Sequence, residues 1–221
     1  MRPRRREAGH AFVELAFMIP LLATLFLGTT FLGLQLVEEL AVTQVARDAG
    51  SMYSRGTDFS ATSPVNQAVL SRLGVMLGWP QSTALGSSDP GVIYLSQIMY
   101  IDSTCNGMAL TDSKGRTCNV SSWVFLNSIV LGNTNLHSSN YGAPPSCLPA
   151  CYDSVINGTS PNLDNININE AYYNANDVVT NFTALGTPAT GTAGFQPGQP
   201  ACLVEVAAYV GKRVDYAFAL Y

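Results

Sequence analysis

One apolar stretch near the amino end, residues 9–37, constrains this chain more than any other feature. Between Phe12 and Leu34 the only ionisable residue is Glu14. A helix of about 20 largely apolar residues is enough to cross a bilayer core of about 30 Å, so we expect a membrane-spanning helix here. The basic residues of the start all lie before the stretch, and the positive-inside rule then places the amino end in the cytoplasm and the carboxy-terminal part outside. These basic residues are Arg2, Arg4, Arg5 and Arg6.

Glu14 indicates that this helix is more than an anchor. A carboxylate inside a membrane segment costs roughly 2.5–3.5 kcal/mol on insertion scales, and a plain anchor has no use for it. Glu14 lies five residues after Gly9 and just beyond the basic leader. A basic run, a glycine, four residues, a glutamate and an apolar helix together resemble the class III signal of type IV pilins and pseudopilins. The resemblance implies cleavage between Gly9 and His10, after which the new amino group would neutralise the glutamate of a neighbouring subunit.

The residues around Glu14 narrow this resemblance. The segments Ala11–Phe17 and Ile19–Leu22, with Pro20 in the second, resemble the start of TadE-like proteins, the minor pseudopilins of tight-adherence (Tad/Flp) pilus systems. The likeness covers about residues 4–50, and Val204–Val210 resembles the end of TadE-like domains. It implies a structural component of Tad pilus assembly in the cytoplasmic (inner) membrane, with no enzymatic activity. Prepilin peptidase, membrane lipid, other pilins or pseudopilins and Tad assembly proteins are the implied partners.

The resemblance also implies a role for particular residues. Gly9 and His10 would form the processing site, and Glu14 and Pro20 would serve assembly. Two positions depart from the family pattern, since His10 follows the expected cut and Glu7 lies within the leader.

Other function classes fit less well. An uncleaved single-pass envelope protein with an extracytoplasmic partner-binding domain stays as the alternative. A removable secretory signal would have an apolar core of only 7–15 residues. An anchored envelope hydrolase lacks a visible catalytic set, because His10 and His137 are the only histidines. The net charge of −4 argues against a nucleic-acid partner, which requires clustered Lys and Arg.

The five cysteines all follow the apolar stretch, as expected for disulfides in an exported domain. Cys105 and Cys118 would close a loop of about a dozen residues, worth about 2.5–3 kcal/mol in the chain-entropy model. Cys147 and Cys151 are too close together to gain much from a mutual bridge, and Cys202 is the candidate partner for one of them. The fifth thiol would be free or would bridge subunits. The spacing of Cys147 and Cys151 also differs from the redox Cys-x-x-Cys motif.

The remaining pattern predicts an α+β fold. We expect a basic leader over residues 1–9, a transmembrane and stalk segment over 10–54, and an exported head domain over 55–221. A single long helix should run through the second segment, from about residue 8 to residue 54. A second helix should open at Ser63-Pro64 and stop at Gly78-Trp79-Pro80. Its expected apolar face comprises Val65, Ala68, Val69, Leu73, Met76 and Leu77.

The head should contain an antiparallel sheet. Strands are predicted over residues 91–102, 123–131 and 202–210 from their β-branched and aromatic content, and residues 214–220 either continue the third strand or form a fourth. A short helix is expected near 174–182, and a loop over 186–200. Residues 164–170 carry many oxygen-bearing side chains but lack the spacing of an EF-hand loop, so we expect neither a metal nor a cofactor.

Overall fold

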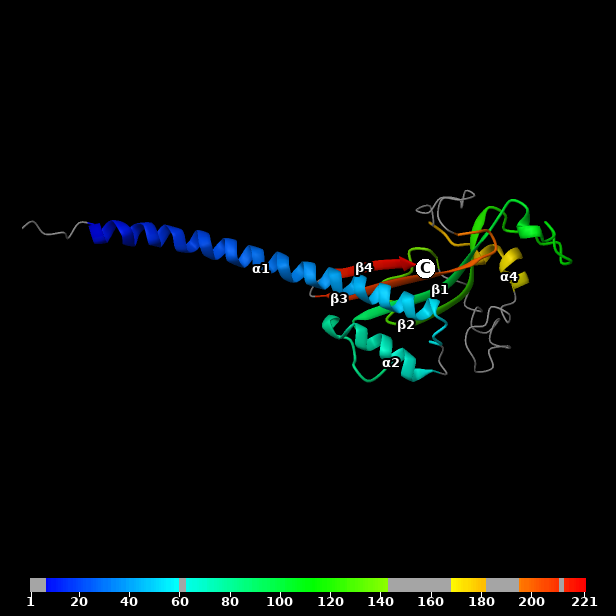
Figure 1. Ribbon diagram of the computed structural model, residues 1–221, viewed down its shortest axis with the longest axis horizontal. Coiled ribbons are helices and arrows are strands. Elements are labelled where there is room, and N and C mark those ends of the chain that lie inside the picture. Colours follow the sequence, from blue (N-terminus) through cyan, green and yellow to red (C-terminus); the bar gives the residue numbers. More distant parts are fainter. Residues whose placement is uncertain (1–6, 60–62, 143–167, 182–194, 211–212) are drawn as a thin grey trace, which may run out of the picture. The chain divides into compact units, whose positions relative to one another are not determined.

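The computed structural model describes residues 7–59, 63–142, 168–181, 195–210 and 213–221 (Figure 1). The chain divides into two units, Met1–Leu40 and Ala41–Tyr221. Helix α1, Glu7–Ser54, contributes to both units and confirms the predicted long helix. The second unit combines the end of α1 with a four-stranded antiparallel sheet, which confirms the α+β expectation.

The first unit consists of the apolar part of α1. Its side chains from Phe12 to Leu40 are almost all exposed, although most are large and apolar. The helix is long and apolar enough to cross a membrane. Pro20 lies inside it, where it removes one backbone hydrogen bond without ending the helix.

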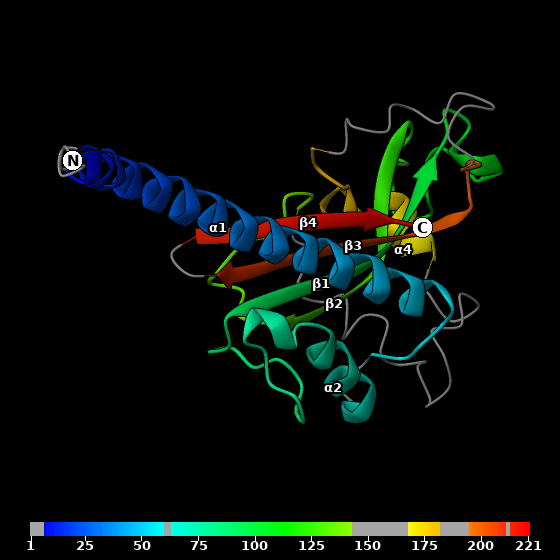
Figure 2. The same ribbon diagram turned by 60° about the vertical axis from the view of Figure 1, so that its left-hand side comes forward.

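The sheet of the second unit has the strand order β2-β1-β3-β4. Strands β1 (Gly91–Ile101) and β2 (Ser122–Gly132) form the predicted antiparallel pair, with one register shift after Gln97. Strand β3 (Pro200–Val210) lies on the other side of β1, and β4 (Arg213–Leu220) pairs with β3. Residues 214–220 therefore belong to a separate fourth strand. Figure 2 shows β4 at the edge of the sheet.

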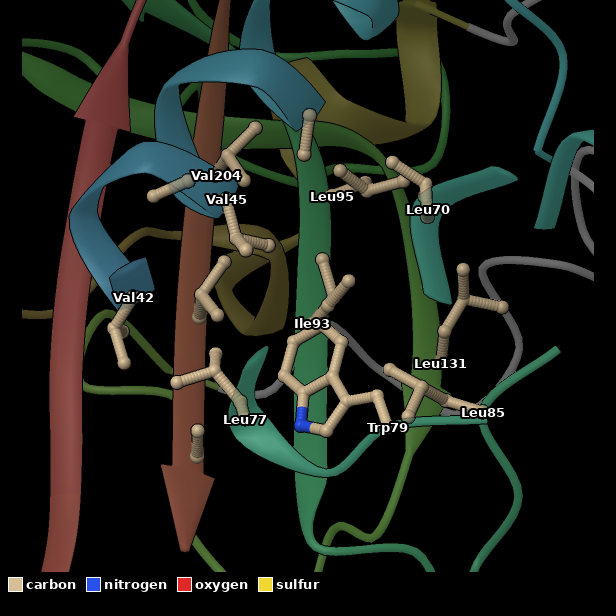
Figure 3. Close-up of a cluster of buried hydrophobic side chains, with 14 of the residues drawn as sticks. Val42, Val45, Leu70, Leu77, Trp79, Leu85, Ile93, Leu95, Leu131 and Val204 are labelled. Carbon is tan, nitrogen blue, oxygen red and sulfur yellow. The ribbon is translucent and has the colours of Figure 1, made fainter. Parts of the chain in front are cut away.

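The main core lies between this sheet and the last turns of α1. Val42, Val45, Ala46, Ala49 and Tyr53 are buried at helical spacing against the sheet. Residues of helix α2 (Pro64–Leu73), of the 3-10 helix η1 (Val75–Leu77) and of the following loop complete the cluster, which Figure 3 shows in close-up. Each large aliphatic side chain buried in this way contributes about 1.5–3 kcal/mol, so the end of α1 is an integral part of the head.

Helix α2, Pro64–Leu73, starts where the sequence predicts, but its predicted apolar face is wrong in part. Val65 and Met76 are 75% and 74% exposed, whereas Leu70, which the pattern did not select, is fully buried. The α-helix also ends earlier than predicted, and η1, Val75–Leu77, follows it.

Trp79 explains this early end. Its ring packs so closely on Gly74 that a Cβ there would lie 2.1 Å from the ring, and its backbone N–H donates to the Gly74 carbonyl. Gly91 contacts the same ring, with 2.3 Å to a Cβ. Both positions therefore require glycine because the indole fills the space beside them.

The opposite face of the sheet is also covered, so that all eleven residues of β1 are buried. Near the start of β1, Leu136 and Tyr216 pack on Val92, Tyr94 and Ala207. Towards the end of β1 a further cluster gathers around Trp123 and Phe125 of β2. A strand buried on both faces reads as a continuous apolar run, which agrees with the sequence of β1.

The β1–β2 connection carries the predicted disulfide between Cys105 and Cys118, with a Cα–Cα distance of 6.2 Å. Both cysteines are buried beside helix α4, Ile168–Tyr173. The interval 174–182, where the sequence predicts a short helix, contains the 3-10 helix η4, Ala175–Asp177, and the α-helix α4 ends just before it. Ala171, Tyr172 and Tyr173 bury themselves against the disulfide, and that tertiary contact sets the position of α4 more strongly than local propensity does.

Candidate functional site

Glu14 lies in α1 among exposed apolar side chains. Its neighbours Val13 and Leu15 are 52% and 55% exposed, and Glu14 is exposed as well. Among the side chains that the structure describes, which begin at Phe12, none forms a hydrogen bond or an ion pair with the Glu14 carboxylate. If the helix enters lipid, the charged Glu14 carboxylate needs a partner other than the side chains that surround it on this helix.

The predicted processing site lies just before Glu14 on the same helix. The backbone of Gly9 and His10 belongs to α1, which starts at Glu7. Residues 10 and 14 are one helical turn apart, about 6 Å along the axis, and positions four apart share a face. A cut after Gly9 would therefore create an ammonium group one turn before the carboxylate, within reach of this helix or a parallel neighbour.

The hydroxyl groups of the apolar segment are satisfied within the helix. Thr24 donates to the Leu21 carbonyl at 2.9 Å, and Thr30 donates to the Phe26 carbonyl at 2.8 Å. Thr29 bonds back to the carbonyl of Leu25 at 3.0 Å. Such bonds remove the cost of placing a hydroxyl in hydrocarbon, so these threonines are compatible with a lipid environment.

Pro20, Gly28 and Gly33 are the other unusual residues of this segment. Pro20 has no N–H to donate to the carbonyl of Ala16. A Cβ at Gly28 or Gly33 would meet no atom within 4 Å, so nothing in this chain requires glycine there. Glycine costs about 0.8–1.0 kcal/mol relative to alanine in a helix, but it allows close approach between membrane helices.

The sequence analysis did not single out Glu205, the one buried carboxylate in the middle of the sheet. It is 1% exposed and lies on β3 with its side chain on the face opposite α1. Ser139 Oγ donates to Oε1, while the Asn140 N–H and the Tyr216 hydroxyl donate to Oε2, each at 2.9 Å. The sequence did contain one signal for this buried carboxylate, namely an acidic residue within the apolar run of β3.

These bonds make Glu205 a structural residue. The carboxylate fastens segment 139–140 across the sheet and is closed off from solvent. Burial, followed by the charge of Glu205, raises the pKa of the Tyr216 hydroxyl above its usual value and keeps it protonated as a donor. The same two causes raise the pKa of Tyr94, whose hydroxyl donates to the His137 carbonyl at 2.7 Å.

The cysteines that were candidates for disulfides differ in their state in the structure. Cys105 and Cys118 are bridged, whereas Cys202 is a free thiol packed at the margin of the main core. Burial raises the pKa of the Cys202 thiol to about 11, which makes it a poor nucleophile at neutral pH. Cys147 and Cys151, the expected partners of Cys202, lie outside the described residues.

Metal binding has no candidate in the part of the chain that the structure describes, which contains no group of three or more His, Cys, Asp or Glu residues suited to an ion. The oxygen-rich segment 164–170 lies mainly outside that part. Asn119, in a glycosylation-like Asn-Val-Ser triplet, uses its side-chain amide to hold the carbonyls of Ala171 and Asn174. Among the described residues, Glu14 is the candidate site.

Comparison with known proteins adds no relative. No protein-family model matches this chain, and no curated protein or solved structure matches it either.

Proposed function

We propose that this chain is a TadE-like minor pseudopilin, a membrane-anchored structural component of tight-adherence pilus assembly. The observation that carries the proposal is a single carboxylate, Glu14, in an exposed apolar helix five residues after Gly9. A membrane anchor gains nothing from this residue, whereas a subunit that packs beside other helices can pair it with a freed amino group.

The surroundings of Glu14 support packing with other helices. Helix α1 presents apolar side chains on all sides over Phe12–Val37, and a helix that is apolar all round belongs in lipid or among other helices. Gly28 and Gly33 leave room for a neighbouring backbone. In the proposed topology the basic leader is cytoplasmic and the sheet-bearing unit lies outside.

The direct test of Glu14 is the substitution Glu14→Ala in cells that contain the whole pilus system. We expect normal amounts of the variant in the membrane fraction but at least a tenfold loss of its co-purification with pilin partners and of pili, because the intersubunit charge pair is gone. Glu38→Ala, in the same helix beyond the apolar stretch, is the matched control and should assemble normally. Unchanged piliation by Glu14→Ala would refute the assigned role.

A further inference from the structure

The head begins very close to the end of the apolar stretch of α1. The stretch ends at Val37, and the second unit starts at Ala41. Four residues span about 6 Å as a helix and at most about 14 Å as an extended chain. If the apolar stretch crosses a bilayer, chain length alone therefore keeps the part of the head around Ala41 at the bilayer surface.

The same part of the head carries the end of β3 and the start of β4. The ring of Tyr221, just after β4, packs so closely on α1 that a Cβ at Gly50 would lie 2.2 Å from it. From Tyr221 the strand leads back about 23 Å to Val214, and α1 leads back about 14 Å from Gly50 to Ala41. Figure 3 shows β3 and β4 extending past Val42. The start of β4 therefore reaches at least as far towards the bilayer as Ala41.

Exposed apolar side chains gather at this end of the sheet. Tyr209 and Val214 are paired across β3 and β4 and are 45% and 40% exposed. Helix η1 lies at the same end, because Trp79 just after it packs on Gly91 at the start of β1, which pairs with the last part of β3. Met76 of η1 is 74% exposed. Apolar groups from two separate segments are thus open at the end of the head where α1 enters.

The chemistry of these side chains suits the boundary between lipid and water. Tyrosine is enriched at membrane surfaces because its ring is apolar and its hydroxyl is polar. Burial of the apolar groups of Met76 and Val214 among the upper acyl chains is favourable. The charged residues at the start of β4, Arg213 and Asp215, pair with each other at 2.9 Å, so the Asp215 charge is compensated beside the headgroups.

We propose that Val75, Met76, Tyr209 and Val214 form a lipid site, through which the head rests on the phospholipid surface of the membrane that α1 crosses. The inference rests on the spanning helix of the proposed function, but not on cleavage or on the pairing of Glu14. Covalent attachment to a spanning helix keeps the head near lipid at all times, so weak contacts at these side chains are enough to orient it.

The test uses the full chain, purified in detergent and reconstituted in phosphatidylcholine vesicles with or without bromine on the upper part of the acyl chains. Bromine quenches tryptophan fluorescence only at contact distance. Met76→Trp and Tyr209→Trp each add one tryptophan to the native pair, Trp79 and Trp123, whose fluorescence in the parent chain is subtracted. The added fluorescence should be at least twofold weaker in brominated lipid at both positions.

Leu110→Trp is the matched control on the head. Leu110 is 58% exposed and lies in the β1–β2 connection, at the opposite end of β1 from Gly91. A tryptophan there should be equally bright in both lipids. Thermal unfolding checks that each variant keeps the fold of the parent. Equal quenching at 110 and 209, or none at either 76 or 209, would overturn the proposal, as it would if a protein partner covered this surface.

Phe26→Trp separates this inference from the proposed function. Phe26 lies within the apolar stretch and is 71% exposed, so a tryptophan there should be quenched strongly by lipid brominated deeper in the acyl chains. Quenching at 26 without quenching at 76 and 209 would refute the lipid site alone and leave the anchored pseudopilin. The absence of quenching at 26 would refute the spanning helix, and both proposals with it. Quenching at 209 should persist in Glu14→Ala, because it needs no second subunit.

Discussion

The two parts of helix α1 differ in where their apolar side chains lie. In Phe12–Leu40 they are exposed on every side, whereas Val42, Val45, Ala46 and Ala49 are at most 1% exposed. The first part is apolar all round as far as Val37, and the second has apolar residues at spacings of three and four with polar residues between them. The two parts of one helix thus lie in different surroundings. The pattern of apolar residues along the helix shows which part packs against the rest of its own chain.

The largest expected effect is from a charge placed in the covered part of α1. Val45→Asp would bury a carboxylate in the main core without a partner, at more than about 4 kcal/mol, and the head should not fold. Leu40→Asp, at a position that is 60% exposed, should change stability by about 0.5 kcal/mol or less. Urea unfolding, followed by tryptophan fluorescence, measures the stability of both variants. Similar unfolding curves would contradict the distinction between the two parts of α1.

Substitutions in α2 test the contribution of the main core, which packs against the end of α1, to the stability of the head. Leu70→Ala should destabilise the head by about 2–5 kcal/mol because it leaves a cavity in the main core. Val65→Ala, on the same helix but 75% exposed, should cost about 0.5 kcal/mol or less. The same unfolding measurement tests both variants. A larger loss of stability for Val65→Ala than for Leu70→Ala would favour the apolar face of α2 that the sequence predicts.

Glu205 tests the face of the sheet that α1 does not cover. Glu205→Ala would leave the Ser139 and Tyr216 hydroxyls and the Asn140 N–H buried without an acceptor, which should cost roughly 2–4 kcal/mol. Glu205→Gln keeps one acceptor oxygen and should cost less. Equal stability of the alanine variant and the parent, by thermal unfolding, would show that segment 139–140 is held in another way.

The smallest effect concerns Cys202, at the margin of the core under α1. Its pKa in the folded chain is about 11, above the usual value of about 8.5, so the folded state holds the thiol proton more tightly. Stability is therefore unaffected by this group below about pH 8 and falls as the pH rises from about 9 through 11. Alkylation of Cys202 at pH 8, followed by peptide mass spectrometry, should be at least tenfold slower than in urea. Equal rates would contradict a thiol that is partly buried and protected by the fold.

Much of this architecture could be predicted from the sequence. The long helix and the strands follow from strong, uninterrupted patterns of apolar residues. The face of α2 could not, because its ten residues hold apolar side chains on more than one side, and only packing against the sheet shows that Leu70 is buried and Val65 is not. The α-helix α4 lies before the interval predicted for a short helix, which contains η4, because the position of α4 depends on a contact with the disulfide, far away in the sequence.

The site residues divide in the same way. Glu14 stands out in the sequence because an acid interrupts an apolar run and no local structure is needed to notice it. Glu205 also interrupts an apolar strand, but its donors come from segment 139–140 and from β4. Only the folded sheet brings these donors to the Glu205 carboxylate, so the sequence of β3 alone does not reveal a buried polar cluster.

The most direct test of the proposed function is the intact mass of the protein from cells with and without an active prepilin peptidase. The proposal predicts a mature chain that starts at His10 only when the peptidase is active, with the new amino group one turn before Glu14. A chain that keeps residues 1–9 in the presence of active peptidase would contradict it, and would leave an uncleaved single-pass protein whose outer domain binds a partner.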